Sequence, residues 1–385
     1  MVRAFPLIAN EAGGGKIYLG SRETDSYIIV ADYWRQLVDI LKEPKKVKEI
    51  TKMFGAVYPH NFSSRVGAFR VKIMLLQMAK SGLIESIDGS SYGGLKVKTS
   101  FSRPTIVRVL FSPPFVWTYG VLLVWAIVGP LVNPDLRISY RDFFWDWRLS
   151  YSLGTFFVFS WILGLFHELA HYLVARYFGI RSKLSVSNRW FFLVLQTEHP
   201  NIYALERLKK IAIYGAGVAA DVLVISLLNM LVVSGYRTGF LRQILLIEWL
   251  GVLWQFLFFM RTDIYFVIRE LFGVENLYTK TKESWRQIMM GKGNSLTFGS
   301  KKERSTIVVY GVFMLLGAVV AIFRYVFYHI PILVTAVFDI YIGIRWGLVG
   351  SGRDKVVDGI VILAVEVMMM VVFLIVIARK KRKNS

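Results

Sequence analysis

The sequence predicts a mainly α-helical, polytopic membrane protein with about six transmembrane helices and a small N-terminal α+β domain. Of its 385 residues, 55% are hydrophobic, and the mean hydropathy is +0.49. This composition is too apolar for a soluble globular protein and indicates several membrane spans. Residues 1–100 differ from the rest because they are charged and interrupted by glycines. They are predicted to form a separate domain.

The N-terminal domain is predicted to have the element order of a winged helix. Apolar residues recur at helical spacing in three segments, 34–41, 47–54 and 66–76. A β-ribbon follows, with a strand at 83–87, a turn at Asp88-Gly89 and a returning strand at 95–98. A winged helix can contact DNA or offer a strand edge to a peptide. Residues 1–20 hold no apolar core of signal-peptide length, which favours a cytoplasmic location.

The basic residues of the third helical segment argue against nucleic acid as a partner. A DNA-reading helix presents a compact basic face. Arg65 and Lys72 are seven residues apart and share a face, whereas Arg70 and Lys80 point elsewhere. A DNA-binding membrane regulator remains the alternative to a peptide-binding domain.

The membrane part is predicted to begin near Arg108, with residues 101–280 as its core and 281–385 as a cytoplasmic loop followed by C-terminal spans. Six spans are predicted at 112–133, 152–176, 210–234, 242–262, 305–327 and 357–378. The apolar segment 330–348 carries Asp339 and Arg345, so we expect it to be re-entrant or interfacial.

The distribution of basic residues supports six spans in a cell membrane. The formal net charge is +21, and basic excess in a membrane protein marks cytoplasmic loops and anionic-lipid contact. The basic clusters lie at Lys45-Lys46, Arg181 to Lys183, Arg207 to Lys210, 280–304 and Arg379 to Lys383. Six spans place all of them on one side, with both termini cytoplasmic. A seventh span at 330–348 would put the basic tail outside.

A possible metal motif, His167-Glu168-Leu169-Ala170-His171, follows the uncharged run 153–166. Residues four apart share a helix face, so both histidines can reach one metal ion. Glu168 can then act as general base on a zinc-bound water. The chain has no cysteine, so a metal must use histidine and carboxylate ligands. Ionisable residues at membrane depth are costly and favour a functional interpretation.

A catalytic zinc site usually takes a third protein ligand. Asp263 is the best candidate, because it ends the fourth predicted span on the same side as the histidine pair. Its alternative role is a helix-end carboxylate paired with Arg261. His199 could approach from a loop, where we expect a surface or substrate-groove residue rather than a metal ligand. The full set of candidates in apolar surroundings is His199, Asp221, Glu248, Asp263, Asp339 and Glu366.

Several segments together resemble the site-2 protease family of intramembrane zinc metalloproteases, and in particular its peptide zinc metalloprotease branch. The resemblance rests on the histidine motif, on 202–210 leading into 214–221, and on 261–266 followed by 271–277. Residues 22–98 are similar to the PqqD peptide-binding domain. The chain departs from the family at Ile264, where glycine is usual, and it lacks a visible Asn-Pro segment.

The resemblance implies one Zn²⁺ per chain, held by His167, His171 and Asp263, with Glu168 as the catalytic residue. The expected activity is a metalloendopeptidase that hydrolyses a peptide bond in a peptide precursor or membrane-anchored substrate. The alternatives are a membrane-anchored regulator with a DNA- or peptide-binding winged helix, and an inactive scaffold that keeps the metal for stability. Gly215 and Gly217, in the third predicted span, are small residues at which helices can approach closely.

Overall fold

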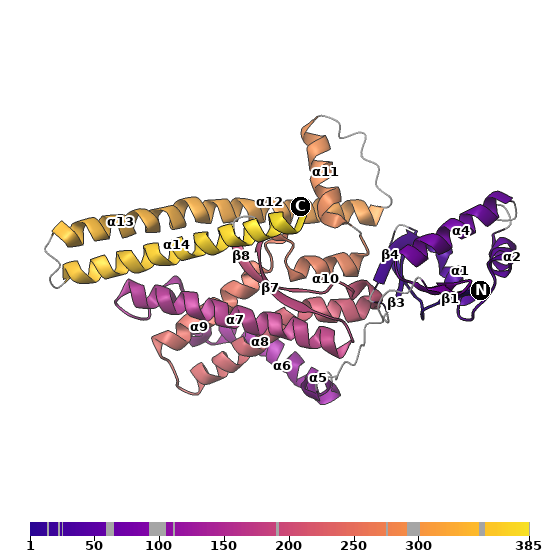
Figure 1. Cartoon of the computed structure of the whole chain (residues 1–385). Coiled ribbons are helices and arrows are strands. Elements are labelled where there is room, and N and C mark those ends of the chain that lie inside the picture. Colours follow the sequence, from indigo (N-terminus) through magenta and orange to yellow (C-terminus); the bar gives the residue numbers. More distant parts are fainter. Residues whose placement is uncertain are drawn as a thin grey trace.

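The computed structural model is mainly helical, with a small domain of strands and helices at one end (Figure 1). It describes residues 1–13, 15–21, 24, 26–58, 65–91, 105–110, 112–189, 192–274, 276–290, 301–345 and 351–384.

The N-terminal domain contains two small antiparallel sheets and three α-helices in its described part. One sheet joins β1 (Val2–Ala4), β5 (Ile84–Ile87) and β6 (Ser90–Ser91), and the other joins β2 (Ile8–Gly13), β3 (Lys16–Ser21) and β4 (Ser26–Ala31). The short helix η1 (Asp32–Trp34) leads into α1 (Arg35–Ile40), α2 (Val47–Val57) and α4 (Arg65–Lys80). Ile17, Leu19 and Phe54 are buried in its core.

The helices of this domain lie where helical spacing predicted them, but the sheet of β2, β3 and β4 was not predicted. The signal was present, because Ile17 and Leu19 alternate with outward residues as a half-buried strand requires. The turn Asp88-Gly89 lies between β5 and β6, as expected. The predicted returning strand at 95–98 lies outside the described residues.

Five helices of the described chain are long and apolar enough to cross a membrane. They are α6 (Pro113–Val132), α7 (Leu149–Tyr177), α8 (Arg207–Val233), the continuous helix Glu303–Arg345, and α14 (Ser351–Asn384). The continuous helix comprises α12 (Lys301–Arg324), a π-helical turn η7 (Tyr325–His329) and α13 (Ile330–Arg345). α5 (Thr105–Leu110) precedes α6.

The structure differs from the predicted spans at two places. The segment 242–262 is not one full span, because α9 (Gly239–Trp254) has 16 residues, or about 24 Å, and the short helix η5 (Phe258–Met260) follows it. The segment 330–348 is not separated from the preceding span, because α13 continues α12 and packs along α14. A Cβ at Gly343 or Gly359 would collide with backbone oxygens across that hairpin, so glycine permits the close packing.

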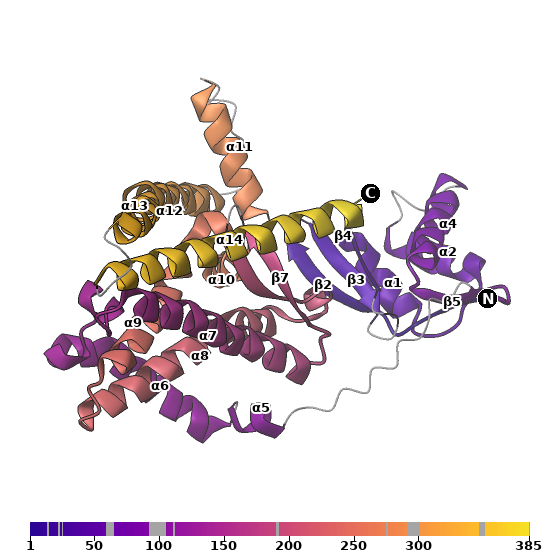
Figure 2. The same cartoon turned by 60° about the vertical axis from the view of Figure 1, so that its left-hand side comes forward.

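α8 is the central helix, in contact with α6, α7, α9 and α10 (Asp263–Phe272). The hairpin of β7 (Lys183–Arg189) and β8 (Phe192–Glu198) contacts α7 on one side and α14 on the other (Figure 2). The Asp358 carboxylate of α14 accepts hydrogen bonds from the backbone N–H groups of Leu149 and Ser150, at 3.2 and 2.9 Å. α7 and α14 therefore begin on the same side of the molecule. α11 (Leu277–Met289) packs against α12.

The N-terminal domain docks on the chain segment that leads into α8. Tyr18 of β3 stacks on Tyr203 of η4 (Ile202–Ala204) with ring centroids 4.4 Å apart. Asn10 Nδ2 donates to the Tyr203 carbonyl at 3.0 Å. Lys210 is 5% exposed, pairs with Glu270 of α10 at 3.4 Å, and lies over the Tyr18 ring. The domain is thus held against α8 and α10.

Candidate metal centre

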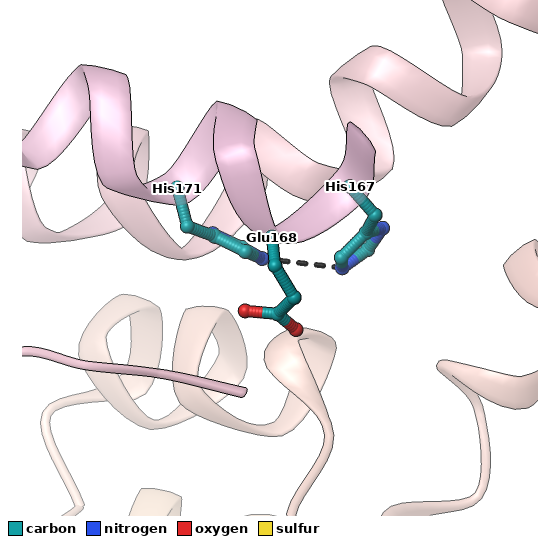
Figure 3. Close-up of side chains that lie close together, drawn as sticks. All are labelled: His167, Glu168 and His171. Carbon is teal, nitrogen blue, oxygen red and sulfur yellow. Dashed lines mark hydrogen bonds between the residues drawn. The ribbon is translucent and has the colours of Figure 1, made fainter. Parts of the chain in front are cut away.

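α7 places His167, Glu168 and His171 on one side of the helix (Figure 3). The two imidazoles are buried, with 8% and 3% exposed, and their Nε2 atoms are 3.2 Å apart. Glu168 lies between them along the chain, and its carboxylate points to the same region as the two rings. One ligand atom from each of the three residues lies within 4.8 Å of the others.

The predicted third ligand, Asp263, joins this pair. Its Oδ2 is 2.9 Å from His167 Nε2 and 3.2 Å from His171 Nε2. Asp263 can reach them because α9 ends early and the chain turns through Arg261, which has a left-handed φ of 54°. Arg189 of β7 donates to the Arg261 carbonyl at 2.7 Å and fixes this turn. The Arg261 guanidinium itself lies over the Tyr278 ring, not against Asp263.

The three atoms have the geometry of one face of a zinc tetrahedron. They form a triangle with sides of 2.9, 3.2 and 3.2 Å. Ligands at about 2.0–2.1 Å from a tetrahedral Zn²⁺ would be about 3.3–3.4 Å apart. Gly217 of α8 faces the same space, because a Cβ built there would lie under 3.0 Å from both Nε2 atoms. The residues present therefore fit a zinc ion in a space that glycine leaves open.

Both histidines have their other ring nitrogen held by the protein. Asp221 Oδ2 is 2.8 Å from His167 Nδ1, and the Ile213 carbonyl is 2.6 Å from His171 Nδ1. A donated Nδ1–H leaves the Nε2 lone pair free for a metal, which is the arrangement of histidine ligands in metal sites. Asp221, one of the candidate third ligands, therefore orients His167 and does not join the triangle. The sequence feature that could have indicated this role is an aspartate within the largely apolar helix α8.

Removing the Asp221 carboxylate is expected to weaken zinc binding by about 10- to 100-fold, the usual cost of losing such a supporting bond. The variant is Asp221→Ala, with Asp221→Asn expected to keep part of the affinity through its amide oxygen. Asp339→Ala is the control, because Asp339 pairs with Lys355 in the α13–α14 hairpin. Affinity is measured by competition with a chelator of known strength. Equal affinity in Asp221→Ala and wild type would contradict the orienting role.

Gln255 also lies at the centre and was missed by sequence reasoning. It is 8% exposed, its Nε2 is 3.3 Å from His167 Nε2, and its Oε1 accepts from the Asp263 backbone N–H at 3.1 Å. The amide therefore supports Asp263 and places an N–H group beside the ligand atoms. The only sequence feature that could have indicated this role is that Gln255 is a polar residue at the end of the apolar run that forms α9.

The other candidates lie outside the triangle. Glu248 is buried in α9, Asp339 is on α13 and Glu366 is on α14. The His199 ring centroid is 6.4 Å from that of His171, and its Nδ1 is 2.7 Å from Ser182 Oγ. Burial, together with the nearby His171, lowers the pKa of His199 to about 4, so its ring is neutral at neutral pH.

Chemically, the centre brings three potential metal ligands next to a carboxylate, an arrangement that could carry out metal-assisted hydrolysis. None of the family models, curated proteins or solved structures compared with the chain matches it. The residues of this centre are therefore the basis for assigning a function.

Proposed function

We propose that the protein is an intramembrane zinc metalloendopeptidase of the site-2 protease kind. The observation that carries the proposal is the convergence of His167, His171 and Asp263 within 3.2 Å of one another, with Glu168 beside them. Two of these ligands come from a membrane-length helix and the third from a segment 92 residues further along the chain. Two buried histidines lie against a buried aspartate, Asp221, and a partly buried one, Asp263. Holding these ionisable groups largely out of water is costly, and a bound metal ion would offset that cost.

The proposed reaction is hydrolysis of a peptide bond. Zinc, when bound, supplies Lewis-acid polarisation of the water and of the scissile carbonyl. Glu168 takes a proton from the attacking water and passes it to the leaving amine. Asp221 holds the His167 ring, and Gln255 holds the backbone N–H of Asp263. The substrate segment must be extended at the scissile bond, because an α-helix occupies its own carbonyls.

We propose a peptide precursor or a membrane-anchored protein as substrate, selected by the N-terminal PqqD-like domain. The docking of this domain through Tyr18 and Tyr203 supports the role, since it lies against the helices that carry the centre. We also propose that both termini face the cytoplasm of a cell membrane. The shared starting side of α7 and α14 supports this, because their basic ends, at Arg176 and Arg379, then lie on the same side of the membrane.

The test is the metal content of the full-length protein in detergent, measured by mass spectrometry. Wild type is expected to hold about one zinc per chain, and His167→Ala and Asp263→Ala are expected to hold almost none, because two remaining ligands do not close a site. Asp339→Ala is again the control. A folded wild type that contains no zinc and takes up none would refute the proposal. Zinc retained in Asp263→Ala would assign the third ligand elsewhere.

A further inference from the structure

We propose that His199 is a further catalytic residue, whose Nε2–H donates a hydrogen bond to the oxygen of the scissile carbonyl as negative charge develops on it. This inference rests on the proposed protease function. It assigns to His199 a contact with the reacting atoms that neither metal binding nor general-base catalysis supplies.

The hairpin next to α7 places His199 beside the centre. β8 runs along α7, and Thr197 Oγ1 donates to the Glu168 carbonyl at 3.0 Å. His199 comes two residues later, and its ring meets the His171 ring at 65° with centroids 6.4 Å apart. α8 closes the opposite side, because Gly217 lies directly against the two Nε2 atoms. Because α8 covers that side, we infer that a substrate carbonyl approaches from the side of Glu168 and His199.

The hydrogen bonds of His199 leave one ring nitrogen free to act. Ser182 Oγ lies 2.7 Å from Nδ1, and Nε2 has no hydrogen-bond partner within the described part of the chain. When the serine hydroxyl donates to Nδ1, the ring proton must be on Nε2. The Ile202 backbone N–H donates to the His199 carbonyl at 3.2 Å, which fixes the backbone of this residue. In this tautomer the ring is held with an N–H donor available at Nε2.

The step balances without a proton from His199. The water oxygen bonds to the carbonyl carbon, and the π electrons of the C=O bond move to its oxygen. The water proton goes to Glu168 and later to the leaving nitrogen as the C–N bond breaks. His199 keeps its proton and donates a hydrogen bond that strengthens as the oxygen becomes negative. Such a donor lowers the barrier because its bond to the charged oxygen is stronger than its bond to the neutral carbonyl.

The experiment measures binding of an anionic probe to the metal-loaded full-length protein, independent of any substrate. The protein is loaded with cobalt(II), and acetohydroxamate, whose oxygens occupy the positions of water and carbonyl, is titrated by visible absorption. His199→Ala is expected to weaken acetohydroxamate binding by about 10- to 100-fold, which is the loss for a hydrogen bond to a charged group. The amount of cobalt bound per chain is expected to stay unchanged. His199→Gln, which keeps an N–H donor, is expected to restore part of the affinity.

The remaining outcomes separate this inference from the proposed function. Equal probe affinity in wild type and His199→Ala would refute the donor role and leave the metal site intact. Loss of cobalt in His199→Ala would make the residue a ligand or a structural support and refute the inference as well. A folded wild type that takes up no cobalt would refute the proposed function and, with it, this inference. The affinity of Ser182→Ala for acetohydroxamate is expected to lie between those of wild type and His199→Ala, because the variant no longer holds the His199 ring.

Discussion

Gly217→Ala is expected to abolish zinc binding, whereas Gly215→Ala is expected to leave it intact. A Cβ at position 217 would lie under 3.0 Å from His167 Nε2 and His171 Nε2, which are the atoms that must face the metal. A Cβ at position 215 meets no atom within 4 Å. The two glycines are on the same helix, two residues apart, and differ in what they face.

Helix stability cannot account for the expected loss at position 217. Alanine stabilises a helix by about 0.5–1 kcal/mol relative to glycine, so both variants favour α8. The methyl group fits only if the imidazoles swing aside or α8 moves away from α7. Either change separates the Nε2 atoms from Asp263 or breaks the bond between Asp221 and His167. Zinc per chain is measured by mass spectrometry for wild type and both variants. Wild-type zinc content in Gly217→Ala would show that the ligands do not close on α8 as described.

Glu168→Gln is expected to keep zinc and to lose hydrolysis by a factor of about 10²–10⁴, the contribution of a general base. Glutamine has the shape of glutamate but cannot take the water proton. The side chain has no role in the metal triangle, and the Thr197 hydroxyl bonds to the backbone carbonyl of residue 168, so fold and metal should survive.

The measurement combines zinc content with cleavage of membrane proteins reconstituted together with the enzyme, read by mass spectrometry of released peptides. Glu206→Gln is the matched control, because Glu206 pairs with Lys209 on the exposed N-terminal end of α8. Peptide release by Glu168→Gln at the wild-type rate would contradict the role of Glu168. Equal, negligible release by wild type and both variants would instead favour the inactive scaffold.

Much of the fold could be predicted, because the spacing of apolar residues and the length of apolar runs determine where most helices form. Apolar runs predicted α6, α7, α8 and α14, and helical spacing predicted the three helices of the N-terminal domain. The early end of α9 was not predictable from hydropathy, because the apolar residues continue to Met260 while the helix ends at Trp254. The chain leaves the helix there because Gln255 and Asp263 bond to each other and to the histidines.

The candidate metal centre could be predicted only as far as the three residues that meet in it. Spacing identified His167 and His171, and the expected side of the membrane favoured Asp263 among six candidates. The role of Asp221 was not predictable, because a carboxylate in an apolar helix can bind a metal or a ligand's second nitrogen equally well. Only the tertiary contact of α7 with α8 distinguishes these two roles of Asp221. The same contact places Gly217 against the Nε2 atoms of His167 and His171.

The length of the helix Glu303–Arg345 has a consequence for how the protein lies in a bilayer. Its 43 residues extend about 64 Å, against a hydrocarbon thickness of about 30 Å. A tilt of about 40°, the upper end for membrane helices, still leaves the helix too long. Figure 1 shows α12 and α13 end to end. They are joined by the π-helical turn η7, and Pro331 is the second residue of α13. Such turns and prolines are where helices bend. Hydrophobic mismatch therefore makes η7 the place where this helix is expected to bend in a bilayer, while Asp358 keeps α14 against the start of α7.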